Sequence, residues 1–103
     1  MIKKEEGIIK LLNLVNDIFG NDAPVINDHW EGDLCAIGLQ KDNKLIYVSI
    51  TGCAKNQYFY ECELLVDDPE EVYIAQDSED NVTEERLLEV MSKFFDIPLV
   101  KNG

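Results

Sequence analysis

The chain has 103 residues, of which 46% are hydrophobic and 29% charged, and its 21 acidic against 9 basic residues give a net charge of -12. This length suits one hydrophobic core of ordinary size, so we expect a single domain spanning residues 1–103. The negative charge argues against binding to nucleic acid or to an anionic membrane, because both need cations that face phosphates. The apolar share is too high for a disordered acidic tail, and a folded domain is therefore predicted.

The N-terminus and the cysteines indicate a cytoplasmic protein. Lys3 and Lys4 are followed by Glu5 and Glu6 instead of the apolar segment of a signal peptide. No run reaches the roughly 18 apolar residues that a membrane helix needs. The three cysteines are an odd number at wide spacings without a CxxC pair, which favours reduced, structural thiols over a disulfide framework or a zinc site.

An amphipathic helix is predicted for residues 3–19. Apolar residues recur there at spacings of three and four, as on one face of a helix. They are Ile8, Leu11, Leu12, Val15, Ile18 and Phe19. Gly20 supplies the left-handed conformation that favours a helix end. The following residues, up to Gly32, are expected to form an irregular connection.

Alternating apolar residues predict an antiparallel meander of three or four strands. Residues 33–40 and 44–51 alternate on either side of a short polar turn, as in a hairpin. A third strand is expected at 57–66, and a short fourth strand at 72–75. Asp67 to Glu71 should break the third strand, because Pro69 cannot continue a paired ladder.

The last element is a well-marked helix that begins after Thr83. This residue can cap the first turn, and Glu84 and Glu85 follow where the helix dipole favours negative charge. Val82 and Leu87 occupy the positions of a hydrophobic staple. With short connections, the two helices pack on one face of the meander, which predicts a two-layer α+β domain.

Catalytic and metal-binding residue patterns are sparse. His29 is the only histidine, and the sequence pattern gives it no nucleophile and carboxylate partners that would complete a catalytic triad. No glycine-rich phosphate loop is present either. We therefore expect no catalytic residue, no cofactor and no metal. The alternative is a small metal-dependent enzyme whose oxygen and imidazole ligands come from one loop. Those ligands would be Asp28, His29, Glu31 and Asp33.

The acidic residues concentrate between Lys55 and Arg86, a stretch without a basic residue. The simplest interpretation is a solvated surface that keeps the protein soluble. If aromatic residues also lie on the sheet face turned away from the helices, this acidic surface would be a binding site for a basic protein partner. A homodimer partner that covers this face is the alternative explanation for the aromatics. The expected partner-binding residues are Trp30, Tyr47, Phe59, Glu61, Glu63, Asp67, Asp68, Glu70 and Glu71.

The pattern of the third strand leaves open which of its faces is buried. If Tyr58, Tyr60 and Cys62 belong to the core, then Phe59, Glu61 and Glu63 accompany Tyr47 on the opposite face. A shift of one residue would exchange the two sets between the faces. Because aromatic residues occur in both sets, the pattern does not decide between them.

Most of the chain resembles the small acidic immunity proteins of bacterial toxin–immunity systems. The resemblance lies in the size, the N-terminal helix, the meander that ends in Tyr58-Phe59-Tyr60-Glu61-Cys62-Glu63, and the closing helix at 82–88 with Phe94-Phe95. The resemblance implies a cytosolic antitoxin that binds its cognate toxin domain through exposed side chains and has no catalytic activity of its own. The acidic surface itself favours a basic toxin domain, such as a nuclease whose cleft must hold phosphates. Acidic secretion chaperones are a second resemblance, although the helix that they carry between their strands is not evident between Asp33 and Ala75.

Overall fold

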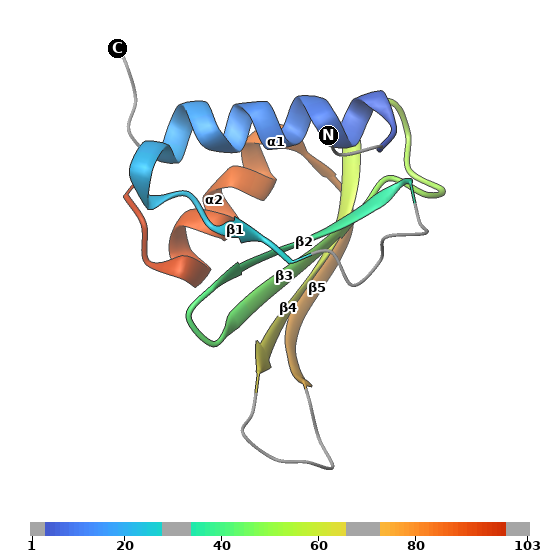
Figure 1. Ribbon diagram of the computed structural model, residues 1–103. Helices are drawn as coiled ribbons and strands as arrows, with labels where there is room; N and C mark the ends of the chain where they lie inside the picture. Colours follow the sequence, from blue (N-terminus) through green and yellow to red (C-terminus); the bar gives the residue numbers. More distant parts are fainter. Residues whose placement is uncertain (1–3, 28–33, 66–72, 99–103) are drawn as a thin grey trace.

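The computed structural model describes residues 4–27, 34–65 and 73–98. In chain order, one helix precedes the strands and another follows them (Figure 1). The elements are α1 (Glu6–Phe19), the 3-10 turn η1 (Gly20–Asp22), β1 (Val25–Ile26), β2 (Ala36–Lys41), β3 (Lys44–Ser49), β4 (Gln57–Leu65), β5 (Tyr73–Thr83) and α2 (Glu84–Phe95).

The strands form one antiparallel sheet in the order β1-β2-β3-β4-β5, which is the meander expected in an α+β domain. Two strand predictions were incomplete. β1 lies in the segment expected to be irregular, and β5 extends from Tyr73 to Thr83 where a strand of only a few residues was expected. The polar stretch before Thr83 is a strand because it pairs with β4, with register shifts between Tyr58 and Tyr60 and between Cys62 and Glu63. A long-range ladder of this kind satisfies the backbone hydrogen bonds whatever the local polarity.

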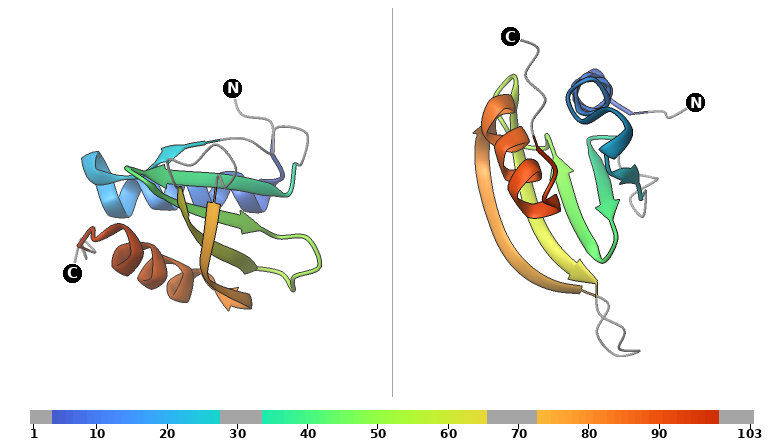
Figure 2. Two further views of the ribbon diagram at one scale, coloured as in Figure 1. Left: turned by 90° about the horizontal axis from the view of Figure 1, so that it is seen from below. Right: turned by 90° about the vertical axis from the view of Figure 1, so that its left-hand side faces the viewer.

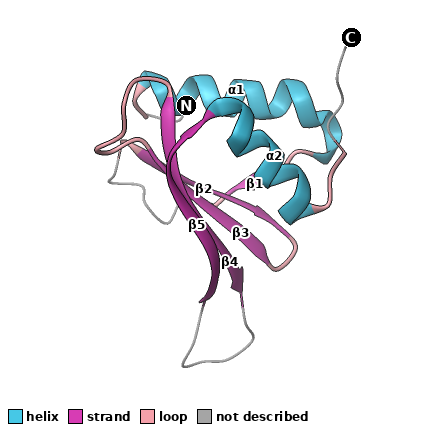
Figure 3. Ribbon diagram, turned by 180° about the vertical axis from the view of Figure 1, so that it is seen from behind, coloured by secondary structure: helices cyan, strands magenta, loops and turns pink. Residues whose placement is uncertain are grey.

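The sheet is strongly curved, and both helices lie against its concave face (Figure 2). We call this the helix face and the opposite side the second face. Seen from behind, β4 and β5 extend beyond the helices (Figure 3). The core fills the space between helices and sheet, with residues from both helices and from β2 to β5. Its largest members include Tyr58, Tyr60, Leu87 and Met91, each no more than 2% exposed.

Helix α1 buries the predicted stripe: Ile8, Leu11, Leu12, Val15 and Phe19 are buried, and Ile18 packs against the core in part. The helix ends at Gly20, which has φ 57° and ψ -128°. This is a positive φ, as expected, but the ψ lies outside the left-handed helical region. Glycine is still suited to the position, because a Cβ makes this combination of angles costly.

Helix α2 begins and ends as its sequence indicates. The Thr83 hydroxyl accepts a hydrogen bond from the Arg86 backbone N–H at 3.1 Å, which confirms the predicted cap. Asp96 stops the helix in the left-handed conformation, with φ 57° and ψ 48°. Within the described residues, no helix has the length and apolar character needed to cross a membrane.

Candidate partner-binding surface

The pairing register places the predicted contact residues on the second face of the sheet. Tyr47 of β3 lies opposite Glu61 of β4, Leu45 lies opposite Glu63, and Ser49 lies opposite Phe59. Directly opposed residues of an antiparallel pair project to the same side. Tyr58, Tyr60 and Cys62 alternate with these residues and are buried in the core on the other side. The structure therefore resolves which face of this strand is buried.

We call Tyr47, Phe59, Glu61 and Glu63 the acidic-aromatic patch. All four are half-buried. The rings of Tyr47 and Phe59 meet edge to face, with centroids 6.1 Å apart and an interplanar angle of 66°. This arrangement is a favourable one for two aromatic rings, so each helps to hold the other in place.

The second face is not open throughout. Leu45 and Ala36, which project to this side, are fully buried at 0% exposure. No residue of the acidic-aromatic patch is fully exposed: all four are half-buried, and Leu45, directly opposite Glu63, is fully buried. A partner would meet a limited set of side chains here.

The two carboxylates of the patch influence one another. Burial first, and then the charge and hydrogen bonding of Glu61, raise the pKa of the Glu63 carboxyl above its usual value. The Oε2 atom of Glu63 is shielded from solvent and has no hydrogen-bond partner in the structure. This oxygen atom has lost hydration without gaining a donor in return.

Lys44 and Lys10 make their contacts away from the acidic-aromatic patch. Lys44 is the only basic residue of β3 and β4, and its Nζ lies 5.8 Å from the centroid of the Phe94 ring, on the helix face. Lys10 pairs with Glu84 at 3.8 Å. Within the described segments, neither Glu61 nor Glu63 forms an ion pair. The negative charge of the patch is consequently not neutralised by these parts of the chain.

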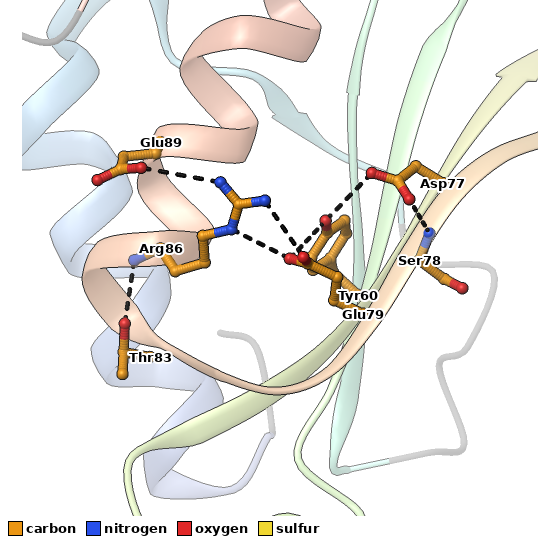
Figure 4. Close-up of polar contacts among 7 residues, drawn as sticks. All are labelled: Tyr60, Asp77, Ser78, Glu79, Thr83, Arg86 and Glu89. Atoms are coloured by element: carbon orange, nitrogen blue, oxygen red, sulfur yellow. Dashed lines mark hydrogen bonds and ion pairs between the residues drawn. The ribbon is translucent and has the colours of Figure 1, made fainter.

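A different polar cluster joins β4, β5 and α2 (Figure 4). The Tyr60 hydroxyl lies 2.9 Å from Glu79 Oε2 and 3.4 Å from Asp77 Oδ2, so its single proton goes to the nearer carboxylate. Arg86 donates from both Nε and Nη2 to Glu79, at 3.1 and 3.2 Å. Arg86 also approaches Glu89 at 3.8 Å. This cluster ties the start of α2 to the sheet.

The protonation of this cluster follows from its contacts. The hydrogen bond from Arg86, followed by the one from Tyr60, lowers the pKa of Glu79. The hydrogen bond to Glu79 and the charge of Glu79 in turn raise the pKa of Arg86. Burial raises the pKa of Tyr60, with Glu79 and Asp77 adding to the effect. The hydroxyl of Tyr60 therefore stays protonated and serves as a donor.

Asp77 and Glu79 belong to the acidic stretch for which a solvated surface was the simplest interpretation. Glu79 is still 37% exposed at its side chain, but it is also held by Arg86 and Tyr60, which that interpretation did not include. The available signal was Arg86, the first basic residue after Lys55, which follows a run of acidic residues. The partner remained hidden because β5 was expected to end before Gln76.

Two hollows flank the helices. One, of about 280 Å³, lies between β4, β5 and α2 and is lined by Cys62, Asp77, Arg86, Val90, Lys93 and Phe94. The other, of about 450 Å³, runs along α1 to Glu84. Burial raises the pKa of the Cys62 thiol to about 12, with nearby carboxylates adding to the effect, so this cysteine is protonated and unreactive.

The remaining predicted residues cannot be placed. Trp30, Asp67, Asp68, Glu70 and Glu71 lie outside the described residues, and so does the loop with the alternative metal ligands. Among the residues that the structure does describe, no group of three or more metal-binding side chains comes together.

Comparison with other proteins gives no relative: no protein-family model, no curated protein and no solved structure matches this chain.

Proposed function

We propose that this protein is a non-enzymatic binding protein of the immunity type, which binds and neutralises a basic toxin domain such as a nuclease. The observation that carries the proposal is the acidic-aromatic patch, where Glu61 and Glu63 lie on the same sheet face as two aromatic rings and form no ion pair with the described residues. The net charge of -12 adds attraction for a basic partner.

Charge and rings would contribute to different stages of binding. The negative field raises the rate of encounter with a basic protein, toward ~10⁸ M⁻¹s⁻¹ at low salt. The rings of Tyr47 and Phe59 then provide contact area that is removed from water and slows release. A nuclease is a fitting partner class because its cleft must be basic to hold phosphates, and an acidic protein can occupy that cleft or a neighbouring surface.

The direct test is capture with the tagged full-length chain from native cell lysate at low and at high salt, followed by mass spectrometry. We expect one basic protein, released as the salt rises, whose cleavage of nucleic acid falls in proportion to the added chain. A collection of unrelated clients would overturn the proposal in favour of a chaperone. Recovery of the chain alone as a dimer would overturn it in favour of a self-associating module.

Charge-reversal variants then locate the contact. Glu61→Lys/Glu63→Lys should slow association with the captured protein and weaken its salt dependence more than the control Asp17→Lys/Glu85→Lys. The control changes the net charge equally, at two exposed helix positions. Equal effects would show that only the overall charge matters, and thermal melts of all variants check that the fold is retained.

A further inference from the structure

We infer that the acidic-aromatic patch is a receptor for an arginine side chain presented by the partner, with Glu61 and Glu63 binding the guanidinium beside the rings of Tyr47 and Phe59. This inference rests on the proposed function and specifies which partner group the surface recognises. It begins from the register, which places Tyr47 directly opposite Glu61 and both carboxylates on one side of β4.

The rings provide one wall of the receptor. Phe59 and Glu61 are separated by one residue on a strand and therefore project to the same face. Tyr47 lies against Phe59 at 6.1 Å and across from Glu61, so the carboxylate and the two rings border the same area. A planar cation that contacts the carboxylates is thereby brought over aromatic surface, where cation–π attraction adds to the charge interaction.

Glu61 and Glu63 provide the negative charge of the receptor, and the environment of the Glu63 carboxylate favours the binding of a cation. Its Oε2 atom is shielded and without a hydrogen bond, while the rest of the side chain is only half-buried. A cation that binds the accessible part of Glu63 offsets the repulsion from Glu61. Among the described residues, the cations of the neighbouring strands, Lys41 and Lys44, lie on the helix face and do not supply this interaction.

Arginine fits this arrangement better than lysine. A guanidinium has five donors in a fixed plane, which can span two carboxylates and stack on rings, whereas an ammonium is a compact and strongly hydrated charge. A bare metal ion fits poorly, since no group of three metal-binding side chains forms in the described residues. A second copy of the chain would bring another charge of -12 toward the same carboxylates, which opposes self-association.

The test compares fluorescein-labelled nona-arginine and nona-lysine, which carry equal charge, by fluorescence anisotropy with the full chain. We expect the arginine peptide to bind at least about tenfold more tightly, because bidentate and stacked contacts are lost with lysine. In Glu61→Gln/Glu63→Gln, the ratio of the two dissociation constants should fall to about 1–2 as those contacts disappear. Asp17→Asn/Glu85→Gln, with the same charge loss, should weaken both peptides while keeping the wild-type ratio.

A second variant separates the rings from the charge. Tyr47→Leu/Phe59→Leu retains both carboxylates, so nona-lysine should bind as before while the preference for nona-arginine decreases about threefold. The inference of an arginine receptor would be overturned if the dissociation constants of the two peptides were nearly equal for the wild-type chain, or if Glu61→Gln/Glu63→Gln left their ratio unchanged. Circular dichroism spectra and melts identify a variant that fails to fold, and the Glu61→Gln and Glu63→Gln single variants then replace it.

The outcome for the receptor is separate from that for the proposed function. If the captured basic protein binds wild type and Glu61→Gln/Glu63→Gln equally, the receptor is wrong while the binding function stands. If the peptides behave as expected but no basic protein is captured, the patch recognises arginine and the immunity function is wrong.

Discussion

On the helix face of the sheet, Glu79 receives hydrogen bonds from Tyr60 and Arg86, whereas on the second face Glu63 lies beside Glu61 without a cation from the described residues. These carboxylates belong to adjacent strands of one sheet. The first is neutralised by its own chain and its pKa is lowered, while the pKa of the second is raised. A carboxylate that is already paired stabilises the fold, and one that is crowded by a like charge gains most from an external cation.

The aromatic residues of β4 show the same division. Tyr58 and Tyr60 are buried on the helix face, and their hydroxyls reach Glu84 and Glu79. Phe59, between them, is half-buried against Tyr47 on the second face. One strand thus provides core packing to one side and a half-buried aromatic pair to the other, because successive side chains point in opposite directions.

The largest expected effect is a core truncation on the helix face. Ile46→Ala removes a fully buried side chain and should lower the free energy of unfolding by about 2–5 kcal/mol. Phe59→Ala, on the second face, should cost only about 1 kcal/mol because its ring is half-buried. Urea unfolding of both variants measures the difference. Equal losses would mean that the second face is as much a part of the core as the helix face.

Thiol labelling offers the next largest contrast. Cys62 is 3% exposed and its pKa is raised to about 12, whereas Cys53 is half-buried in the connection between β3 and β4, where burial also raises its thiol pKa. In the native protein at pH 8, Cys62 should react with a disulfide reagent at least about 100-fold more slowly than Cys53. The reagent reaches the buried Cys62 less easily, and a smaller fraction of this thiol is ionised. Single-cysteine variants resolve the rates. Rapid labelling of Cys62 would show that β4, β5 and α2 separate readily.

The hydroxyl of Tyr60 has a smaller effect. Tyr60→Phe keeps the buried ring but removes the donor to Glu79, which should cost about 1 kcal/mol, as for an ordinary hydrogen bond. Thermal unfolding measures the loss, with Tyr47→Phe as the matched change on the second face. An unchanged stability for Tyr60→Phe would mean that Arg86 alone secures Glu79.

The smallest effects concern pH, and they have opposite signs. Glu79 has a lowered pKa, so its contribution to stability is present above the unfolded pKa and is lost as the pH falls through the folded value. Glu63 has a raised pKa, so its charge destabilises the fold at neutral pH and this penalty disappears on acidification through the raised value.

Glutamine variants separate these contributions. At pH 7, Glu79→Gln should lower the urea midpoint and Glu63→Gln should raise it slightly. As the pH falls, the gain from Glu63→Gln should vanish first, because Glu63 takes up its proton at the higher pH. A loss of stability in Glu63→Gln at pH 7 would show that its charge is already compensated within the chain.

The local sequence determined much of this protein. The apolar spacing of 3–19 and of the last helix, the Thr83 cap and the alternation in β2, β3 and β4 each express a preference of neighbouring residues, and the structure confirms them. The same alternation predicted that Tyr47, Phe59, Glu61 and Glu63 share one face once the core side of β4 was known.

The tertiary structure decided what depends on distant pairing. The length of β5, the burial of Tyr58 and Tyr60 on one side of β4, and the bond from Arg86 to Glu79 all require β4 and β5 to align in one register. Local preference carries no information on that register, because both faces of β4 bear aromatic residues. The packing of the helices on one face selects the register, and with it which carboxylates are paired with Arg86 and which have no cation among the described residues.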